Sequence, residues 1–345
     1  MNICFIMYPW EDIVPGDDST LCLIQECAIR GHQVALTTNA GLTIRDSIPL
    51  AFSEVLIKQE KVSNKPTIFY KQSKFKQQML PLAGFDVIFM RANPPLDSLV
   101  LNFLDSVKED VFIINNIDGL REANNKLYTA AFYDPKNEII PKTYVSKNKD
   151  YLKQVIEETD ADKMIMKPLN GYGGSGVIVI EKNASMNISS LLDFYIQGKS
   201  KDDESNYVIL QEYVPGAELG DIRVLMLHGE PIGAMRRVPA KDEARSNVSA
   251  GGTVQKHTLT REEKRLCRIV GKKLVQDGLY FVGLDLIGGK LIEVNVLSPG
   301  GISYINKLHK TRLERKVVDY LEEVVMTKES HTARRQEFRR AVADA

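Results

Sequence analysis

The sequence is short of cysteine, has no excess of either charge and contains no long apolar run, and each shortage narrows the class of protein. Its 345 residues include four cysteines, Cys4, Cys22, Cys27 and Cys267, without a C-x-x-C pair, which argues against a disulfide scaffold or a zinc site. Lys plus Arg and Asp plus Glu both number 45, so no overall basic field attracts nucleic acid or an anionic membrane.

No apolar stretch approaches transmembrane length, and the first residues, MNICFIM, lack the basic leader of a signal sequence. We therefore expect a cytoplasmic protein with small-molecule partners, and neither nucleic acid nor membrane. A content of 43% hydrophobic and 26% charged residues is ordinary for a globular chain, and the length allows two or three domains.

The first 120 residues predict an α/β domain with a mainly parallel sheet. Apolar runs at residues 3–7, 34–38, 87–90 and 111–114 have the length of strands, and helical patterns follow them. Ligands of such sheets bind beyond the carboxyl ends of the strands, which makes Asp18, Ser19 and Arg91 candidate binding residues. The alternative for Asp18 and Ser19 is a helix cap, and Gly31 would end that helix.

From about residue 119 the pattern changes to α+β. We expect helices at 120–132 and 151–158, with strands at 142–145, 163–167 and 177–181. After the polar stretch 198–206 come strands at 207–213, 223–227 and 233–238, and a helix at 261–276. The pattern therefore predicts two α+β layers, one before and one after the polar stretch.

The segment FVGLDLIGGKLIEVNVLSP, residues 281–299, predicts a β-hairpin with its turn at Gly288 and Gly289. Strand periodicity places Asp285, Glu293 and Asn295 on one face. Three hard oxygen donors suit Mg²⁺, which completes its coordination with substrate phosphates. The plainer alternative is the solvated face of a half-buried hairpin.

A glycine-rich turn, residues 171–176, matches G-x-G-x-x-G but is not expected to bind a dinucleotide. A Rossmann turn must open a helix, whereas the β-branched run VIVI follows here. No Lys-Ser or Lys-Thr follows either, so it is not a Walker A loop. The pattern predicts a hairpin whose backbone N–H groups cover phosphates, with Lys167 beside it; the alternative is an ordinary hairpin tip.

Several ordered motifs resemble the prokaryotic-type glutathione synthetases, which have the ATP-grasp fold. The likeness extends from residue 1 to about 325. It is carried by these segments: FDVIFMRANPP, REANNKLYTAAF, MIMKPLNGYGGSGV, VILQEYVPG, DIRVLMLHGEPI, RRVPAKDEARSNVSAGG and FVGLDLIGGKLIEVNVLSP.

The resemblance implies ATP and two Mg²⁺ (Mn²⁺ being the other candidate ion), with γ-glutamylcysteine and glycine joined through an acyl phosphate. The metal ligands would be Asp285, Glu293 and Asn295. ATP would be bound by Lys126, Lys167, Gly171, Gly173, Gly174, Ser175, Gly176, Gln211, Glu212, Tyr213, Val214 and Asp221. Gln211 to Val214 would face adenine and Asp221 the ribose.

The same resemblance assigns residues to the acid substrate and to catalysis. Substrate-binding residues would be Asp18, Ser19, Arg91, Arg237, Ser298, Pro299 and Gly300, and catalytic residues Arg223, Arg245, Asn247 and Gly252. A guanidinium binds planar oxyanions bidentately and keeps its proton, although a lone arginine is by default a surface residue. The polar, glycine-ended loop 239–252 would close as a lid over the intermediate; an ordinary surface loop is the alternative.

Two positions depart from the family pattern. Gly300 replaces a Thr after Ser-Pro, and Asn93 replaces an Asp in the segment after Arg91. Other ATP-grasp carboxylate-amine ligases, with a different acid or amine, therefore remain an alternative, and a catalytically idle nucleotide-binding module is another.

The expected domains are an N-terminal substrate domain (1–120), a central ATP-grasp subdomain (121–205), a C-terminal catalytic subdomain (206–325) and a tail (326–345). A homo-oligomer is also expected.

Overall fold

The computed structural model describes residues 1–171, 174–182, 185–197, 206–240 and 251–343. The chain forms two compact units. Unit 1 comprises Met1–Arg121, Val275–Phe281 and Leu297–Ala345, and unit 2 comprises Glu122–Leu274 and Val282–Val296. Each unit is built around its own sheets, so the C-terminal part of the chain returns to the N-terminal unit.

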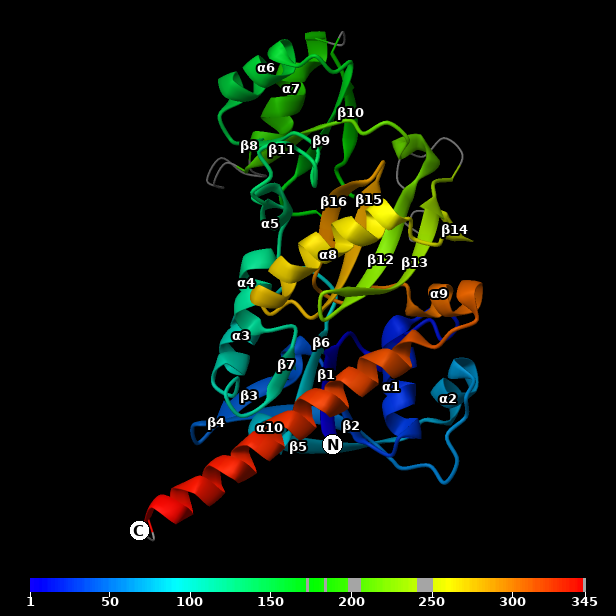
Figure 1. The fold of residues 1–345 in the computed structure, drawn as a ribbon, viewed down its shortest axis with the longest axis vertical. Coiled ribbons are helices and arrows are strands. Elements are labelled where there is room, and N and C mark those ends of the chain that lie inside the picture. Colours follow the sequence, from blue (N-terminus) through cyan, green and yellow to red (C-terminus); the bar gives the residue numbers. More distant parts are fainter. Residues whose placement is uncertain (172–173, 183–184, 198–205, 241–250, 344–345) are drawn as a thin grey trace. The chain divides into compact units, whose positions relative to one another are not determined.

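Unit 1 contains a seven-stranded sheet in the order β3-β4-β2-β1-β6-β7, with β5 paired to β4 (Figure 1). Its parallel part joins β2, β1, β6 and β7, and β3, β4 and β5 are antiparallel. The strands are β1 Asn2–Met7, β2 Gln33–Thr37, β3 Leu42–Arg45, β4 Ile48–Leu56, β5 Phe75–Pro81, β6 Val87–Arg91 and β7 Phe112–Ile114. The apolar run of β1 is fully buried, as expected for a central parallel strand.

Two helices of unit 1, α1 and α3, begin at aspartate caps. Asp18 accepts a hydrogen bond from the backbone N–H of Leu21 and starts α1, and Asp97 caps α3. The helices are α1 Ser19–Ile29, α2 Pro66–Gln72, α3 Ser98–Asp105, α4 Ile117–Ala123, α9 Ile302–His309 and α10 Leu313–Ala343, with short 3₁₀ turns at Trp10–Asp12, Asn39–Gly41 and Leu82–Gly84. Gly31, with φ of 78°, ends the α1 region as the sequence predicts.

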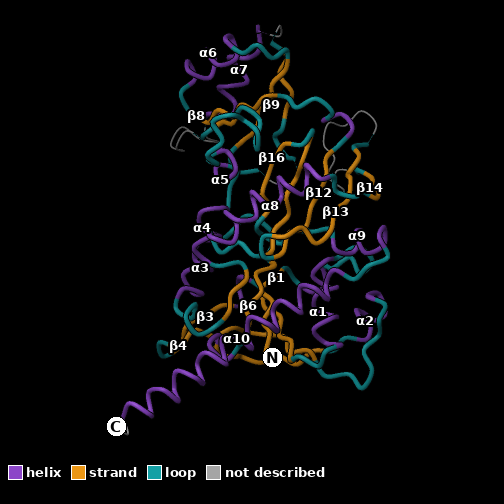
Figure 2. Tube along the Cα trace, in the orientation of Figure 1, coloured by secondary structure: helices purple, strands orange, loops and turns teal. Residues whose placement is uncertain are grey.

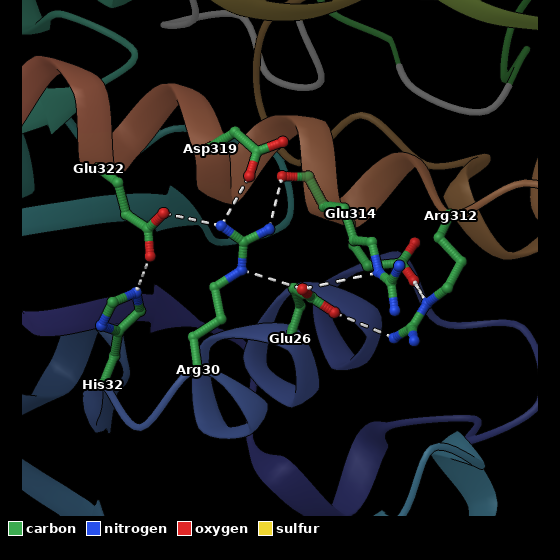
Figure 3. Close-up of polar contacts among 8 residues, drawn as sticks. Glu26, Arg30, His32, Arg312, Glu314, Asp319 and Glu322 are labelled. Carbon is green, nitrogen blue, oxygen red and sulfur yellow. Dashed lines mark hydrogen bonds and ion pairs between the residues drawn. The ribbon is translucent and has the colours of Figure 1, made fainter.

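A network of ion pairs joins α1 to α10 (Figure 3). The side chain of Glu26 is only 4% exposed and lies 3.0 Å from both Arg30 Nε and Arg312 Nη2. The carboxylate of Glu322, on α10, lies 2.8 Å from Arg30 Nη1 and 2.8 Å from His32 Nε2. A buried carboxylate shared by two guanidiniums fixes α10 against the N-terminal helix.

Beyond this contact α10 continues with few neighbours in its unit (Figure 2). Leu321 and Val325 are buried, whereas Met326 is 68% exposed. Lys328 Nζ donates to the backbone carbonyls of Glu109 and Asp110 at 2.7 and 2.6 Å. The described side chains between residues 329 and 334 are exposed.

Unit 2 has two sheets. The four-stranded sheet, in the order β10-β9-β11-β8, is antiparallel and is covered by α6 and α7 (Figure 1). Its elements are β8 Thr143–Ser146, α6 Lys149–Glu158, β9 Lys163–Pro168, β10 Ile178–Glu181, α7 Ser185–Ile196 and β11 Val208–Glu212. Its apolar core joins α6, α7 and the strands through Leu152, Leu192, Met166 and Val208.

The second sheet of unit 2 has the order β14-β13-β12-β15-β16. It consists of β12 Asp221–Leu227, β13 Glu230–Val238, β14 Thr253–Lys256, β15 Phe281–Ile287 and β16 Lys290–Asn295, with α8 Arg261–Gln276 and the turn Ala217–Leu219. Thr260 and Glu263 form a reciprocal capping box at the start of α8. A Cβ on Gly271 would lie 2.0 Å from the carbonyl of Gly229, so α8 approaches this sheet closely only because the residue is glycine.

One expectation about the elements was wrong, and several elements were not predicted. The helix expected at 120–132 is interrupted after Ala123, and α5 restarts at Leu127–Ala130 because Asn125 Oδ1 accepts from the N–H of Leu127. The antiparallel strands β3, β4 and β5, with α2, were not anticipated.

No helix among the described residues is long and apolar enough to cross a bilayer. The four cysteines are free and buried.

Candidate active site

The β15–β16 hairpin brings the three predicted metal ligands to one face. Gly288 and Gly289, with φ of 54° and 75°, form the two-residue turn, and the register pairs Asp285 with Glu293 and Gly283 with Asn295. Asn295 Nδ2 donates to Asp285 Oδ2 at 3.0 Å. These two carboxylates and one amide are hard oxygen donors of the kind that Mg²⁺ and Mn²⁺ accept.

Among the described residues, no group of three or more His, Cys, Asp and Glu side chains could hold a metal ion.

Two arginines surround the carboxylate of Asp285. Arg223 contacts it bidentately, with Nε 2.5 Å from Oδ1 and Nη2 3.0 Å from Oδ2, and Arg237 Nη2 lies 3.0 Å from Oδ2. Burial alone would raise the pKa of Asp285, but the two guanidiniums outweigh it and hold that pKa well below its usual value. Asp285 is therefore a carboxylate at neutral pH.

Arg237 also joins Asp285 to a second predicted ligand residue. Its Nε and Nη2 donate to Asp221 at 2.7 and 2.6 Å. The guanidinium predicted to hold substrate thus lies between the carboxylate expected at the ribose and a carboxylate expected at the metal. Sequence reasoning did not anticipate this chain of ion pairs, because its members come from β12, β13 and β15.

The two predicted phosphate-binding lysines come from different elements. Lys126 Nζ lies 3.1 Å from Glu293 Oε1 and donates to the carbonyl of Gly171 in the glycine-rich turn. Lys167 is buried and donates to Gln211 Oε1 at 2.9 Å. Burial is the main reason that the pKa of Lys167 is lowered to about 8, with Glu293 opposing the shift and Lys126 adding to it.

The glycine-rich turn connects two antiparallel strands. Ile178 of β10 pairs with Met166 of β9, so no helix opens there and the dinucleotide interpretation is excluded by the local fold. Gly174 and Gly176 have φ of 76° and 70°, a conformation that suits glycine. Ser175 lies between them in the described turn, whereas Gly173 lies outside the described residues.

A cavity of about 500 Å³ collects these groups within unit 2. The charged and amide side chains that line it are Lys126, Lys167, Gln211, Glu212, Asp221, Asp285 and Glu293. Gly174, Tyr213 and Val214 also line it. Its apolar lining includes Ile165, Val177, Val179, Ile287 and Ile292. An apolar surface beside convergent charges has the size and character of a small-molecule site.

Unit 1 contains a second cluster of predicted residues. Ser19 Oγ accepts from the N–H groups of Gly301 and Ile302, both at 3.0 Å. Arg91 is 1% exposed and donates from Nη1 to the carbonyl of Pro299 at 3.2 Å. Ser298 adopts φ of 41°, a left-handed conformation that is uncommon for serine. Ser298, Pro299 and Gly300 thus belong to the segment that contacts Ser19 and Arg91.

Tyr8 and Thr20 complete this cluster and were missed by the sequence analysis. The Tyr8 hydroxyl donates to the Asp18 carboxylate, and Arg91 Nε donates to Thr20 Oγ1 at 3.0 Å. Asp18 also caps α1, so the helix-cap alternative holds for it. The position of Tyr8 directly after the first strand was the available signal.

Part of the predicted site lies outside the described residues. Arg245 and Asn247 fall within residues 241–250, which also contain most of the expected lid. Gly252 is described and directly precedes β14.

Known structures share this fold. The ATP-grasp ligase PsnB, in a complex with minimal precursor, Mg and ADP, superposes with a TM-score of 0.60 at 14% identity, over 94% of this chain and 98% of that one. D-alanine–D-alanine ligase from Bacillus anthracis gives a TM-score of 0.54 at 12% identity, over 96% and 99% of the two chains. These likenesses show that the chain has the ATP-grasp fold.

Sequence relatives narrow this class. The N-terminal domain model of prokaryotic glutathione synthetase matches residues 1–121, and the ATP-grasp domain model of the same family matches residues 125–310. Glutathione synthetase from Gloeobacter violaceus is 35% identical, over 94% of this chain and 97% of the relative, and that from Synechocystis sp. is 35% identical, over 93% and 99%. The chain belongs to the prokaryotic glutathione synthetase family. It is an ATP-dependent ligase of glutathione synthesis that acts on small molecules and uses a divalent metal.

Proposed function

We propose that the unit 2 cavity binds ATP and that the chain uses it to join γ-glutamylcysteine to glycine. The observation that carries this proposal is the convergence of Lys126 and Lys167 with Asp285 and Glu293 on one cavity of about 500 Å³. Phosphoryl transfer requires positioning and charge neutralisation more than covalent help from the protein, and this lining supplies both.

Each part of the nucleotide has a matching group in the lining. Lys126 and Lys167 provide ammonium groups for the phosphates, Gly174 lines the same cavity, and Lys126 contacts the carbonyl of Gly171. Ser175 and Gly176, in the same glycine-rich turn, are proposed to bind the phosphates with them. The strand end Gln211–Val214 offers backbone groups and apolar surface to adenine, and the Asp221 carboxylate accepts hydrogen bonds from ribose hydroxyls.

Asp285, Glu293 and Asn295 suit a divalent ion, because the three residues lie on one hairpin face and each side chain carries a hard oxygen donor. We propose Mg²⁺ as that ion, with Mn²⁺ as a functional substitute. Bound there, the metal supplies neutralisation of phosphate charge. The carboxylates of this chain orient it, and Arg223 and Arg237 hold the Asp285 carboxylate in position.

The reaction has two balanced steps. A carboxylate oxygen of γ-glutamylcysteine takes the terminal phosphoryl group of ATP, which gives an acyl phosphate and ADP. The glycine amine then attacks the acyl carbon, and inorganic phosphate leaves as the peptide bond forms. We propose that Arg223, Arg245, Asn247 and Gly252 stabilise the negative charge, and that the loop at 239–252 excludes water.

We propose that the acid substrate is bound by residues of unit 1, namely Asp18, Ser19, Arg91, Ser298, Pro299 and Gly300. Arg237, in unit 2, keeps the substrate-binding role that the resemblance implies. A second candidate function follows from Gly300, which departs from the family pattern within the segment that contacts Arg91. A ligase of the same mechanism with another acid or amine would fit that change, since a few hydrogen bonds decide such discrimination. An idle nucleotide-binding module is the weaker alternative, since these ionisable groups are all present.

The test supplies ATP and Mg²⁺ with γ-glutamylcysteine and glycine, and then with other acid and amine pairs. Phosphate release and product mass are measured together. Glutathione mass with stoichiometric phosphate supports the proposal, and product only with another pair supports the second candidate. ATP binding without phosphate release for any pair contradicts both.

We also propose a cytoplasmic location and a homo-oligomeric state. Four free, buried thiols fit a reducing compartment. Fractionation and light scattering test these two points.

A further inference from the structure

A second cavity lies entirely within unit 1 and is not used by the proposed reaction. It has a volume of about 330 Å³ and is formed where β1 and β2 end, beside β4. In open α/β sheets ligands bind at the carboxyl ends of the strands, and this volume suits a small organic molecule. The cavity therefore has both the place and the size of a binding site.

The charges on this cavity are all of one sign. Glu11 and Glu54 contribute the charged side chains, and no Lys, Arg or His is among the residues that line it. Gln77 Nε2 donates to Glu54 Oε1 at 3.0 Å, which orients that carboxylate. Phosphates and carboxylates would be repelled here, whereas an ammonium group would be attracted.

The walls are aromatic and held in place. Trp10 stacks on Tyr70 with 4.9 Å between ring centroids and meets Phe75 edge-on at 4.9 Å. Phe52 lies on the same face of β4 as Glu54 and is 58% exposed, so its ring is accessible to a ligand in the cavity. A cation over aromatic faces gains attraction from the ring quadrupole, so aromatic walls and carboxylates favour the same ligand.

Tyr8 links this cavity to the Asp18 cluster. Tyr8 is one of the residues that line the cavity, and its hydroxyl contacts Asp18 and, at 3.2 Å, Thr20 Oγ1. Burial and the Asp18 charge raise the pKa of Tyr8 above its ordinary value, so the hydroxyl remains a donor to Asp18. A ligand in this cavity would therefore lie next to the residues assigned to the acid substrate.

We propose that this unit 1 cavity binds an organic ammonium, with its charge between Glu11 and Glu54 and its body against Trp10, Tyr8 and Phe52. The ammonium has two chemical sources, which are the amino group of the acid substrate or a separate amine. The site itself does not depend on the ligase activity, and only the arm with γ-glutamylcysteine rests on the proposed function.

Trp10 makes the test direct, because it is the only tryptophan of the chain and its emission reports on this cavity. The intact protein is titrated with benzylammonium, and with benzyl alcohol and benzoate as neutral and anionic matches. We expect saturable quenching by benzylammonium, with the alcohol at least about tenfold weaker and benzoate without effect. Equal affinities for benzylammonium and benzyl alcohol would overturn the proposal.

Matched variants test whether the carboxylates of Glu11 and Glu54 bind the ammonium group. Glu11→Gln and Glu54→Gln should each weaken benzylammonium binding about three- to tenfold and leave benzyl alcohol unchanged. Glu60→Gln, at an exposed carboxylate that does not line the cavity, is the control. Thermal unfolding of each variant is measured alongside, and Glu11 is exposed, so its variant remains informative if Glu54→Gln is unstable. Both variants matching the control would overturn the proposal.

A competition experiment without ATP decides whether the ammonium group belongs to the acid substrate or to a separate amine. Displacement of benzylammonium by γ-glutamylcysteine, with a raised KM for the acid and an unchanged KM for ATP in Glu11→Gln, assigns the cavity to the substrate's own amino group. Benzylammonium binding that γ-glutamylcysteine does not displace assigns a separate amine. Failure of the ligase assay leaves the benzylammonium titration unaffected, so the two proposals fail independently.

Discussion

Asp285 and Glu293 are cross-strand partners in the β15–β16 ladder, and their carboxylates face the same cavity. They differ in their cationic partners: Asp285 is held by Arg223 and Arg237, whereas Glu293 is paired with Lys126 at 3.1 Å. A buried carboxylate between two guanidiniums is fixed in place, while a carboxylate paired with one flexible lysine can move. Asp285 is therefore suited to anchor the site, and Glu293 to adjust to the metal and phosphates.

Glu293→Gln tests the metal assignment with almost no change in side-chain size. We expect turnover to fall by about 100-fold or more with the fold retained, because a metal ligand loses its charge. The same variant should bind Mn²⁺ more weakly in a paramagnetic titration without substrates. Glu157→Gln, on the exposed face of α6, is the control, and turnover of Glu293→Gln near that of the control would exclude Glu293 as a ligand.

Arg223→Gln tests the ion pairs that hold Asp285. Removing one partner of a buried pair should lower the unfolding free energy of unit 2 by about 3 kcal/mol, since the remaining charge is then poorly compensated. Arg268→Gln removes an exposed pair with Glu230 (3.1 Å, side chains 59% and 62% exposed) and should cost no more than about 1 kcal/mol. Chemical denaturation measures both.

The pH dependence of the Arg223 variant has a definite sign. In the native protein the pKa of Asp285 is depressed, so its stabilising contribution is present above the unfolded value of about 4 and is lost as pH falls through the lower folded value. Without Arg223 the folded pKa rises, so acid unfolding should begin at a higher pH. Identical acid limbs for the two proteins would show that Arg223 does not set that pKa.

Local patterns predicted the hairpin, and distant pairings explain what was missed. The alternation in residues 281–296 and the Gly288-Gly289 turn are local, so they place Asp285, Glu293 and Asn295 together without knowledge of the rest. The Arg223–Asp285 pair joins residues 62 positions apart, and no periodicity encodes it. Strand β5 was missed because its middle residues, 76–78, are exposed and polar, so tertiary pairing with β4, not an alternating apolar pattern, makes it a strand.

The resemblance to a known family predicted site residues, such as Lys126, that hydrophobic periodicity could not. Lys126 follows Asn124 and Asn125, which interrupt the expected helix, and no local signal distinguishes it from a surface lysine. Its inclusion depended on motif order, and the cavity lining places it beside Lys167. Tyr8 has no motif and no charge, so its place directly after the first strand was the available signal for its contact with Asp18.

Lys167 should make nucleotide affinity depend on pH. Its pKa of about 8 means that the ammonium is present below that pH and is progressively lost above it. The affinity for ADP with Mg²⁺ should be level below pH 8 and fall by at most tenfold per pH unit above it. Lys167→Arg keeps its charge throughout this range and should give a level profile to about pH 9.5. Equal slopes in a fluorescent-nucleotide titration of the two proteins would assign the pH effect to another group.

Removal of residues 329–345 should leave the fold intact. The described side chains between 329 and 334 are exposed, and the family match ends at residue 310, so little packing is lost. We expect a melting temperature within about 2 °C of the full chain and unchanged turnover. Leu321→Ala, at a fully buried position on the same helix, should instead cost about 2–5 kcal/mol. If the truncated chain melts several degrees lower, or has a smaller oligomeric mass in light scattering, the end of α10 makes a contact between copies.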